Sequence, residues 1–114
     1  MTSSMASILP YAGCAAYSAS KIFVNYLAEA LFTEHKNVVD VLAYTPGFVV
    51  TKMAKELKTK PDSETISVEY AAEVCFRDLG ISPVSSGAFK HEFGKWMMKC
   101  FSLDMVSAYV KKRV

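Results

Sequence analysis

Apolar positions recur at the spacing of an α-helix in two stretches of the chain. The first runs from Ala15 to His35, and its apolar members are Ile22, Phe23, Tyr26, Leu27, Ala30 and Leu31. This period predicts one long helix whose apolar stripe packs into the core or against another helix. The second stretch begins after Ser67, a suitable N-cap, and ends at Gly80, so a second helix is predicted there.

Other stretches have the composition of β-strands. Residues 38–45 are mostly apolar and β-branched, with the length of a buried parallel strand, and Pro46-Gly47 ends the run abruptly. Residues 88–93 are predicted to form a final short strand. Residues 1–16 are small and rich in hydroxyl groups, which predicts the end of a strand that leads into a loop.

Two further segments mix lysines with apolar residues. Residues 52–60 predict a short amphipathic helix. Residues 95–110 are rich in methionine and aromatic side chains, a composition that is usually core. The nearby Lys95, Lys99 and Lys111 leave a membrane interface open as the alternative. Because Lys99 interrupts the apolar stretch, no membrane-spanning helix is predicted.

Length and composition narrow the class of protein. At 114 residues the chain holds one small domain, and a net charge of +2 gives no reason to expect a nucleic-acid partner. The three cysteines are odd in number and lack metal-ligand spacing, which predicts free thiols in a reducing compartment and no metal site. No residue at alternating positions around His91 could bind a metal together with it, so His91 is predicted to have no functional role. No basic residue precedes the first apolar stretch, so no signal peptide is predicted.

Tyr17 and Lys21 carry the first candidate chemistry. They are four residues apart on a predicted helix and therefore lie on the same face, one above the other. A lysine cation roughly 4–5 Å from a phenol, at an effective dielectric of ~20, stabilises the phenolate by about 3–4 kcal/mol. A phenol activated in this way can protonate a carbonyl oxygen or take the proton back. The spacing alone also fits an ordinary exposed pair.

Two more features stand in order around this pair. Ser4 precedes Tyr17 by thirteen residues, and Pro46-Gly47-Phe48-Val49-Val50-Thr51 follows one predicted helix and one predicted strand later. In this order and spacing the chain resembles the catalytic half of short-chain dehydrogenases/reductases. The run Tyr-Ser-Ala-Ser-Lys from Tyr17 to Lys21 is similar to the branch of 17β-hydroxysteroid dehydrogenases and very-long-chain 3-oxoacyl-CoA reductases. The resemblance is strong over residues 3–51 and looser beyond them.

The resemblance implies a catalytic role for three residues. Tyr17 would be the general acid, with Lys21 as the cation that activates it and as a ligand of the cofactor's ribose hydroxyls. Ser4 would hydrogen-bond the substrate carbonyl oxygen and stabilise the charge that builds there. The adjacent Ser3 would take this task if the register slips by one residue.

The same resemblance implies an NADP(H) or NAD(H) cofactor, whose binding residues would be Tyr17, Lys21, Pro46, Gly47, Val49 and Thr51. The backbone of Val49 would contact the nicotinamide carboxamide, and the Thr51 hydroxyl would reach the same region. This position agrees with the general rule that ligands of doubly wound sheets bind at the carboxyl ends of strands. The lysines of residues 52–60 would either meet the phosphates of a coenzyme A thioester or form a solvated face.

The implied fold class is α/β, the C-terminal part of a Rossmann-like doubly wound parallel sheet. Residues 1–114 would form one partial domain, catalytic and substrate-binding, with a C-terminal helical segment. The five glycines form no phosphate-binding cluster, so the N-terminal dinucleotide-binding strands are expected to be absent and the isolated chain to be inactive. The strand over residues 38–45 would then have an unpaired edge.

Two functions fit these features. One is an oxidoreductase that reduces the ketone of a steroid or a 3-oxoacyl-CoA, a lipid-like substrate, to an alcohol with NADP(H). The alternative is a catalytically inactive remnant that acts only in protein or membrane-surface association, including a homodimer through the Ala15–His35 helix. Lys111 and Lys112, fourth and third from the end, resemble the dilysine retrieval signal of endoplasmic-reticulum membrane proteins. They predict the cytosolic face of that membrane, and otherwise the cytoplasm.

Overall fold

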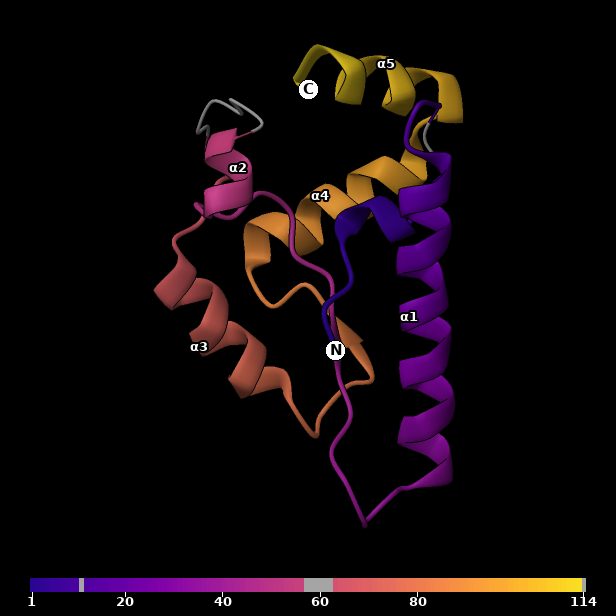
Figure 1. Ribbon diagram of the computed structural model, residues 1–114, viewed down its shortest axis with the longest axis vertical. Helices are drawn as coiled ribbons and strands as arrows, with labels where there is room; N and C mark the ends of the chain where they lie inside the picture. Colours follow the sequence, from indigo (N-terminus) through magenta and orange to yellow (C-terminus); the bar gives the residue numbers. More distant parts are fainter. Residues whose placement is uncertain (11, 57–62, 114) are drawn as a thin grey trace.

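The computed structural model describes residues 1–10, 12–56 and 63–113, and helices make up most of it (Figure 1). In chain order its elements are the 3-10 helix η1 (Met5–Ser7), α1 (Ala15–Glu34), β1 (Ala43–Tyr44), α2 (Lys52–Glu56), α3 (Val68–Asp78), β2 (Val84–Ser85), α4 (Phe89–Cys100) and α5 (Leu103–Arg113). The chain therefore has the α/β class that its sequence predicts.

Three segments of extended chain lie side by side at the centre of the molecule. β1 and β2 are parallel, with Ala43 opposite Val84 and Tyr44 opposite Ser85. On the other side of β1, Thr2 forms a parallel bridge with Tyr44. The parallel sheet is thus confirmed, and so is the expectation that the first residues form the end of a strand.

The strand predicted over residues 38–45 is much shorter in the structure. β1 has only two residues, and Val38 is 83% exposed. The hydrogen bonds to the neighbouring segments extend only from Leu42 to Pro46. The amide of Val38 donates instead to the carbonyl oxygen of His35 at the end of α1. The prediction from apolar, β-branched composition made the strand too long. The first four residues of the run have no neighbouring strand in the described part of the chain.

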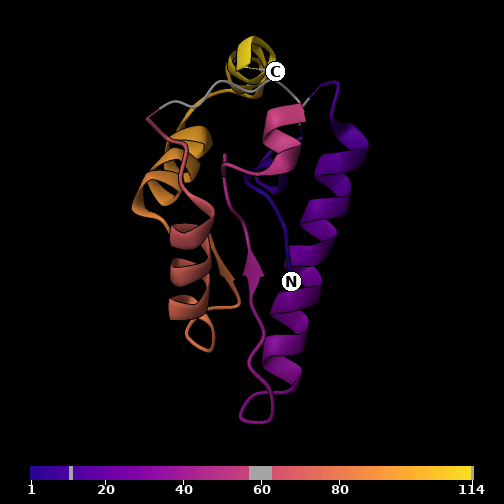
Figure 2. The same ribbon diagram turned by 60° about the vertical axis from the view of Figure 1, so that its left-hand side comes forward.

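Helices cover both faces of these strands. Figures 1 and 2 show α1 on one side and α3 on the other, while α4 and α5 lie toward the end of the molecule where the strands finish. The main cluster of buried apolar residues consists of Tyr44, Ile66, Ala71, Val74 and Ala88. Burial raises the pKa of Tyr44 to about 12, so its phenol is neutral at physiological pH.

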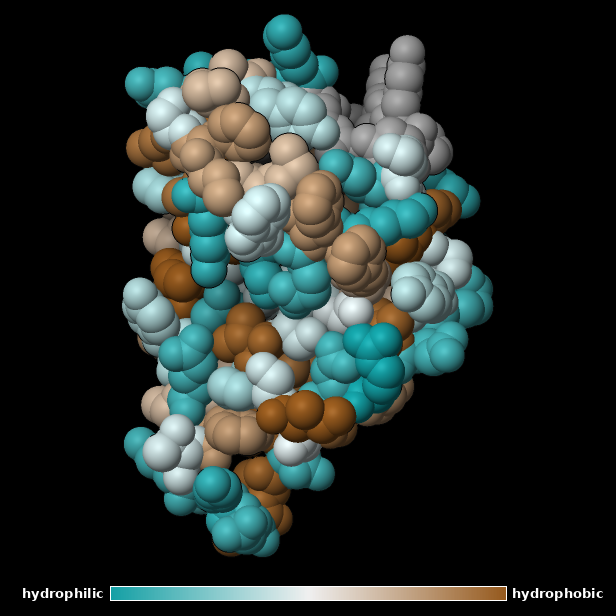
Figure 3. Space-filling model, turned by 180° about the vertical axis from the view of Figure 1, so that it is seen from behind, coloured by the Kyte–Doolittle hydropathy of each residue, from teal (hydrophilic) through white to brown (hydrophobic). Residues whose placement is uncertain are grey.

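Helix α1 confirms the long helix predicted over residues 15–35, but part of its predicted stripe faces outward. The buried residues of α1 are Ser18, Asn25 and Ala28. Phe23 and Tyr26 are instead 65% and 66% exposed. Seen from behind, hydrophobic side chains lie at the surface among hydrophilic ones along the side of the molecule where α1 lies (Figure 3). A core role for this part of the stripe is therefore wrong, which leaves contact with another helix.

The strand predicted over residues 88–93 is wrong. This segment enters α4 at Phe89, and the amide of His91 donates to the carbonyl oxygen of Ala88 in the first turn. Phe89, Phe93 and Trp96 recur at helical spacing rather than alternating, which is why a helix forms. The observed second strand, β2, lies a few residues earlier.

The prediction that residues 95–110 form core is also wrong for most of their large apolar side chains. The exposed ones are Trp96, Met97, Phe101, Leu103, Met105 and Tyr109, whereas Val106 is 4% exposed. The segment breaks at Ser102 into α4 and α5, so its apolar residues are divided between two helices. A short helix pair cannot bury every side of itself, which explains the exposure.

The remaining two predicted helices are present. In α3, Ser67 is the N-cap, with Oγ accepting from the amide of Tyr70, and Gly80 follows the helix at a φ of +83°. The helix predicted over residues 52–60 is confirmed as α2 for residues 52–56, and positions 57–60 lie outside the described residues. Within the described ranges, no helix is long and apolar enough to cross a membrane.

Candidate active site

Two adjacent serines near the start of the chain, Ser3 and Ser4, differ in burial and in their hydrogen bonds. Ser3 is buried, and its Oγ donates to the carbonyl oxygen of Lys21 at 2.9 Å. Ser4 is the N-cap of η1, with Oγ accepting from the amide of Ala6 at 3.1 Å. Because Ser4 Oγ acts as an acceptor in this bond, its own proton is left to donate to a carbonyl oxygen. This geometry favours Ser4 over Ser3 as the hydroxyl that faces a substrate.

Tyr17 and Lys21 lie near the beginning of α1 and on the same side of it. The Nζ atom of Lys21 is 5.5 Å from the centroid of the Tyr17 ring. The same Nζ donates to the carbonyl oxygen of Thr2 at 3.2 Å, which holds the ammonium beside the strand end that leads into the two serines. Tyr17 is 44% exposed, so its ring can be reached from outside.

The segment at Pro46 and Gly47, directly after β1, lies against both the serine segment and α4. The carbonyl oxygen of Pro46 accepts from the amide of Met5 at 3.0 Å. A Cβ atom on Gly47 would lie 2.8 Å from Cδ2 of His91 and 2.8 Å from Sδ of Met5. Real Cβ atoms do not approach other atoms so closely, so a side chain at this position would force its neighbours to move.

His91 binds the backbone of this segment at Gly47, and the sequence predicts no role for it. The side chain is 1% exposed; its Nδ1 accepts from the amide of Gly47 at 3.1 Å, and its Nε2 lies 2.9 Å from the carbonyl oxygen of Glu64. These partners require a neutral ring protonated on Nε2. Burial lowers the pKa of His91, against a smaller opposing effect of the bond to Glu64. The contact joins residues 44 positions apart, so no local spacing could have signalled it.

Val49 and Thr51, the predicted cofactor contacts, lie directly after the turn. Val49 forms a parallel bridge with Ile66, and the groups used are the amide of Val50 and the carbonyl of Phe48. In a parallel pair the amide and carbonyl of the bridging residue point to the opposite side, so those of Val49 point away from Ile66. Thr51 Oγ1 accepts from the amide of Ala54, which places its hydroxyl at the start of α2.

Asn25 is a second residue that the sequence did not single out. It lies one turn beyond Lys21 on α1, is buried, and donates through Nδ2 to Ser7 Oγ at 2.8 Å. Ser7 Oγ in turn donates to the carbonyl oxygen of Ser4 at 2.7 Å. Oδ1 of Asn25 and Oγ of Ser18 are buried without a hydrogen-bond partner among the described residues. The inner side of α1 is therefore polar beneath the serines, the opposite of what its apolar stripe predicts.

These contacts link Tyr17 and Lys21 to the strand end that leads into Ser4, and they link the residue after Ser4 to Pro46. Among the described residues, no hydrogen bond or β-bridge joins Val49 or Thr51 to this group. The resulting chemistry is a phenol beside a cation, together with a hydroxyl that has a proton to donate, and this combination suits proton transfer to a carbonyl oxygen. Within the described residues, no group of three His, Cys, Asp or Glu side chains could hold a metal ion.

Comparison with known proteins identifies the family of the chain. A family model described as short chain dehydrogenase matches residues 1–62, more than half of the chain and all of the predicted site residues. The chain belongs to the short-chain dehydrogenase family, whose members are oxidoreductases that use nicotinamide cofactors. The predicted family is thereby confirmed.

Curated relatives narrow the branch. The chain is 29% identical to the very-long-chain 3-oxoacyl-CoA reductase of Anas platyrhynchos over 111 residues, which cover 96% of this chain and 35% of the relative. It is 31% identical to very-long-chain 3-oxoacyl-CoA reductase-A of Danio rerio, covering 91% and 33%. It is 36% identical to the 3-dehydrosphinganine reductase of Danio rerio, covering 81% and 29%. The chain thus spans about a third of the length of these relatives, and no solved structure matches it at the same stringency.

Proposed function

We propose that this chain is the catalytic and substrate-binding part of a reductase that converts the ketone of a lipid-like substrate to an alcohol with NADPH or NADH. The observation that carries this proposal is the position of the Lys21 ammonium, 5.5 Å from the centre of the Tyr17 ring and bonded to the strand end that leads into Ser4. Relatives named for 3-oxoacyl-CoA and 3-dehydrosphinganine reduction support a long-chain 3-oxo compound over a steroid.

In this proposal each of three side chains acts at the carbonyl oxygen. Ser4 donates its hydroxyl proton in a hydrogen bond and stabilises the negative charge that develops on that oxygen. Tyr17 transfers its proton to the same oxygen, and Lys21 stabilises the phenolate that remains. The hydrogen bonds at Thr2, Ser3 and Met5 hold these groups in place before a substrate arrives.

The nicotinamide cofactor would supply the hydride for the carbonyl carbon. Lys21 is proposed to bind its ribose hydroxyls, and the outward-pointing peptide groups of Val49 suit a hydrogen-bonding carboxamide. Pro46, Gly47 and Thr51 form the turn that would border it. The chain contains no glycine cluster for the cofactor's phosphates, so we expect the isolated chain to bind NADPH far more weakly than micromolar and to have no measurable turnover.

The test is a chimera in which this chain replaces the matching residues of the Anas platyrhynchos reductase. NADPH oxidation is followed with a long-chain 3-oxoacyl-CoA. Tyr17→Phe is expected to lower kcat by about 10²- to 10⁴-fold, because it removes the general acid. The matched control is Tyr26→Phe, an exposed tyrosine on the same helix, which should leave kcat unchanged. Full activity of the Tyr17→Phe chimera would exclude this mechanism.

A second candidate function, association through α1, is favoured by one observation. Phe23 and Tyr26 are largely exposed on the face of a 20-residue helix that carries the predicted apolar stripe. A second copy of the chain could cover this face and form a homodimer. Sedimentation equilibrium tests it: Phe23→Glu should produce monomers, whereas Phe76→Glu, at a similarly exposed phenylalanine on α3, should not. We also propose, from Lys111 and Lys112, that the chain associates with a membrane surface and lies on the cytosolic face of the endoplasmic reticulum.

A further inference from the structure

One face of α4 exposes a row of aromatic rings. Phe89, Phe93 and Trp96 follow one another at the spacing of helical turns, and all three are exposed, Phe89 by 80%. The ring centroids of Phe89 and Phe93 are 6.3 Å apart, and those of Phe93 and Trp96 are 5.8 Å apart. The three rings therefore pack against one another along the helix and form a continuous apolar ridge, which we call the aromatic row.

The opposite side of α4 is held against the rest of the molecule. His91 is buried, and its ring contacts the backbone of Gly47 and of Glu64. Met98, which is half-buried, lies roughly 180° around the helix from Phe89. Because this inner side is anchored, α4 cannot turn the aromatic row inward.

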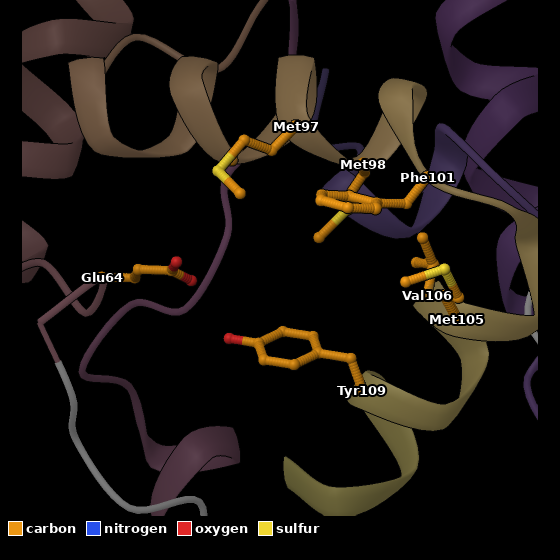
Figure 4. A pocket seen from close by; sticks show the side chains of 8 residues that line it. Glu64, Met97, Met98, Phe101, Met105, Val106 and Tyr109 are labelled. Carbon is orange, nitrogen blue, oxygen red and sulfur yellow. The ribbon is translucent and has the colours of Figure 1, made fainter.

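The apolar surface continues from the aromatic row into a pocket between α4, α5 and the segment that precedes α3. Its volume is about 290 Å³. Figure 4 shows Met97, Phe101 and Met105 converging on it, and all three are also exposed. Met97 is four residues after Phe93 and therefore lies beside the aromatic row. Methionine side chains are flexible and polarisable, so this part of the surface can adapt to hydrocarbon chains.

Positive charge accompanies this apolar surface. Residues 89–114 contain six basic and two acidic residues, a formal charge of +4, whereas residues 1–88 contain seven basic and nine acidic residues, a charge of −2. One of the two acids, Glu92, is neutralised by Lys95 at 2.7 Å. Lys90 and Lys99 are exposed and lie on opposite sides of the aromatic row. Long cationic side chains in such flanking positions can reach past an apolar surface to polar head groups.

We propose that the aromatic row, with the pocket beside it, docks on an anionic lipid surface. The rings enter the boundary between head groups and acyl chains, where tryptophan and phenylalanine of interfacial helices are placed, and the flanking lysines meet the lipid phosphates. A second copy of the chain is a poorer occupant, because it would bring another surface of charge +4 against this one. The inference rests on the membrane-surface association proposed above, and it is independent of ketone reduction.

The test is titration of the 114-residue chain with lipid vesicles, followed by the fluorescence of Trp96, the one tryptophan in the sequence. Its emission should shift to shorter wavelength with vesicles of phosphatidylcholine that contain about 30% phosphatidylserine. The affinity should be at least about tenfold lower for vesicles of phosphatidylcholine alone, because the lysines then lose their electrostatic attraction. Raising the salt to about 0.5 M should weaken binding to the anionic vesicles for the same reason.

Two pairs of variants locate the contact. Phe89→Glu places a carboxylate in the aromatic row and should weaken binding by at least about tenfold. Phe76→Glu on α3, where the side chain is 73% exposed, should leave binding unchanged. Lys99→Gln should weaken binding to the anionic vesicles about fivefold, whereas Lys36→Gln, at an exposed position after α1, should not.

The possible outcomes separate this surface from its alternatives. No change in Trp96 emission with anionic vesicles, equal affinity for the two kinds of vesicle, or equal losses in Phe89→Glu and Phe76→Glu would overturn the proposal. An emission shift that grows with protein concentration in the absence of vesicles would overturn it in favour of a second copy of the chain. Binding that survives Phe89→Glu but is lost when Lys111 and Lys112 are both changed to glutamine would also overturn it, and would leave the membrane-surface association itself intact.

Discussion

The two ends of the chain are built in contrasting ways. In residues 1–51, hydrogen bonds hold the segments together: the amides of Ser3 and Met5 donate to the carbonyl oxygens of Tyr44 and Pro46, and the Lys21 ammonium donates to the strand end at Thr2. In α4 and α5, most apolar side chains remain exposed and the helices meet around a pocket. The first region is suited to hold reacting groups in fixed positions, and the second to adapt to a ligand.

His91 joins these two regions, because it is the side chain of α4 that binds the turn at Gly47. This hydrogen bond therefore connects the hydrogen-bonded first region to α4. If the rigid end owes its order to His91, changes there should disturb the catalytic turn, whereas changes around the pocket should be tolerated. The following predictions test this in order of decreasing effect.

The largest expected effect is that of His91→Ala. The substitution leaves a cavity and removes the partners of the Gly47 amide and the Glu64 carbonyl, so we expect it to lower the free energy of unfolding by about 3–4 kcal/mol. Urea unfolding followed by circular dichroism measures it. The control is His35→Ala at the exposed end of α1, which should change stability by less than about 0.5 kcal/mol. Equal losses would mean that the turn is held by other contacts.

Gly47→Ala is expected to follow, with a loss of about 1–3 kcal/mol. The added methyl would lie 2.8 Å from Cδ2 of the buried His91 ring and 2.8 Å from Sδ of Met5, so these side chains would have to move. Gly94→Ala is the matched change in the other region: its methyl would meet only the flexible end of Met5 at 3.3 Å. A smaller loss for Gly94→Ala, below about 1 kcal/mol, would support the contrast, and a larger one would reverse it.

The same contrast explains what could be predicted from the sequence. The long helix, the cap at Ser67 and the end of the strand before Pro46-Gly47 were predictable, because each depends on local spacing or on the conformational restrictions of single residues. The family followed from the same residues and is confirmed by the match over residues 1–62.

What could not be predicted depends on distant partners. Phe23 and Tyr26 of the apolar stripe of α1 face outward because the buried side of the helix carries Asn25, which binds Ser7, and helical periodicity alone could not show which face packs. β1 is short because its length is set by its neighbours rather than by its own composition. The role of His91 is invisible without the fold, since its two partners are 27 and 44 residues away.

The pH dependence of stability should also report on His91. Its pKa is lowered in the folded state, so as pH falls below about 6.5 the unfolded chain takes up a proton first. The contribution of the neutral ring is therefore fully present above about pH 6.5 and is lost as pH falls toward the folded pKa, at no more than about 1.4 kcal/mol per pH unit. Urea midpoints between pH 7.5 and 5 measure this slope. It should flatten in His91→Ala and persist in His35→Ala.

The smallest effects distinguish the two adjacent serines. Ser3→Ala removes a buried hydrogen bond to the carbonyl oxygen of Lys21 and should lower stability by about 1 kcal/mol. Ser4→Ala removes a cap on only a three-residue 3-10 helix at a half-buried position, so its effect on stability should be smaller. In the chimera the order reverses: Ser4→Ala should lower kcat by about 10²-fold because the hydroxyl that stabilises the carbonyl oxygen is lost. If Ser3→Ala instead gave the greater loss of kcat at unchanged stability, the catalytic register would shift by one residue, and Ser4 would be only the cap of η1.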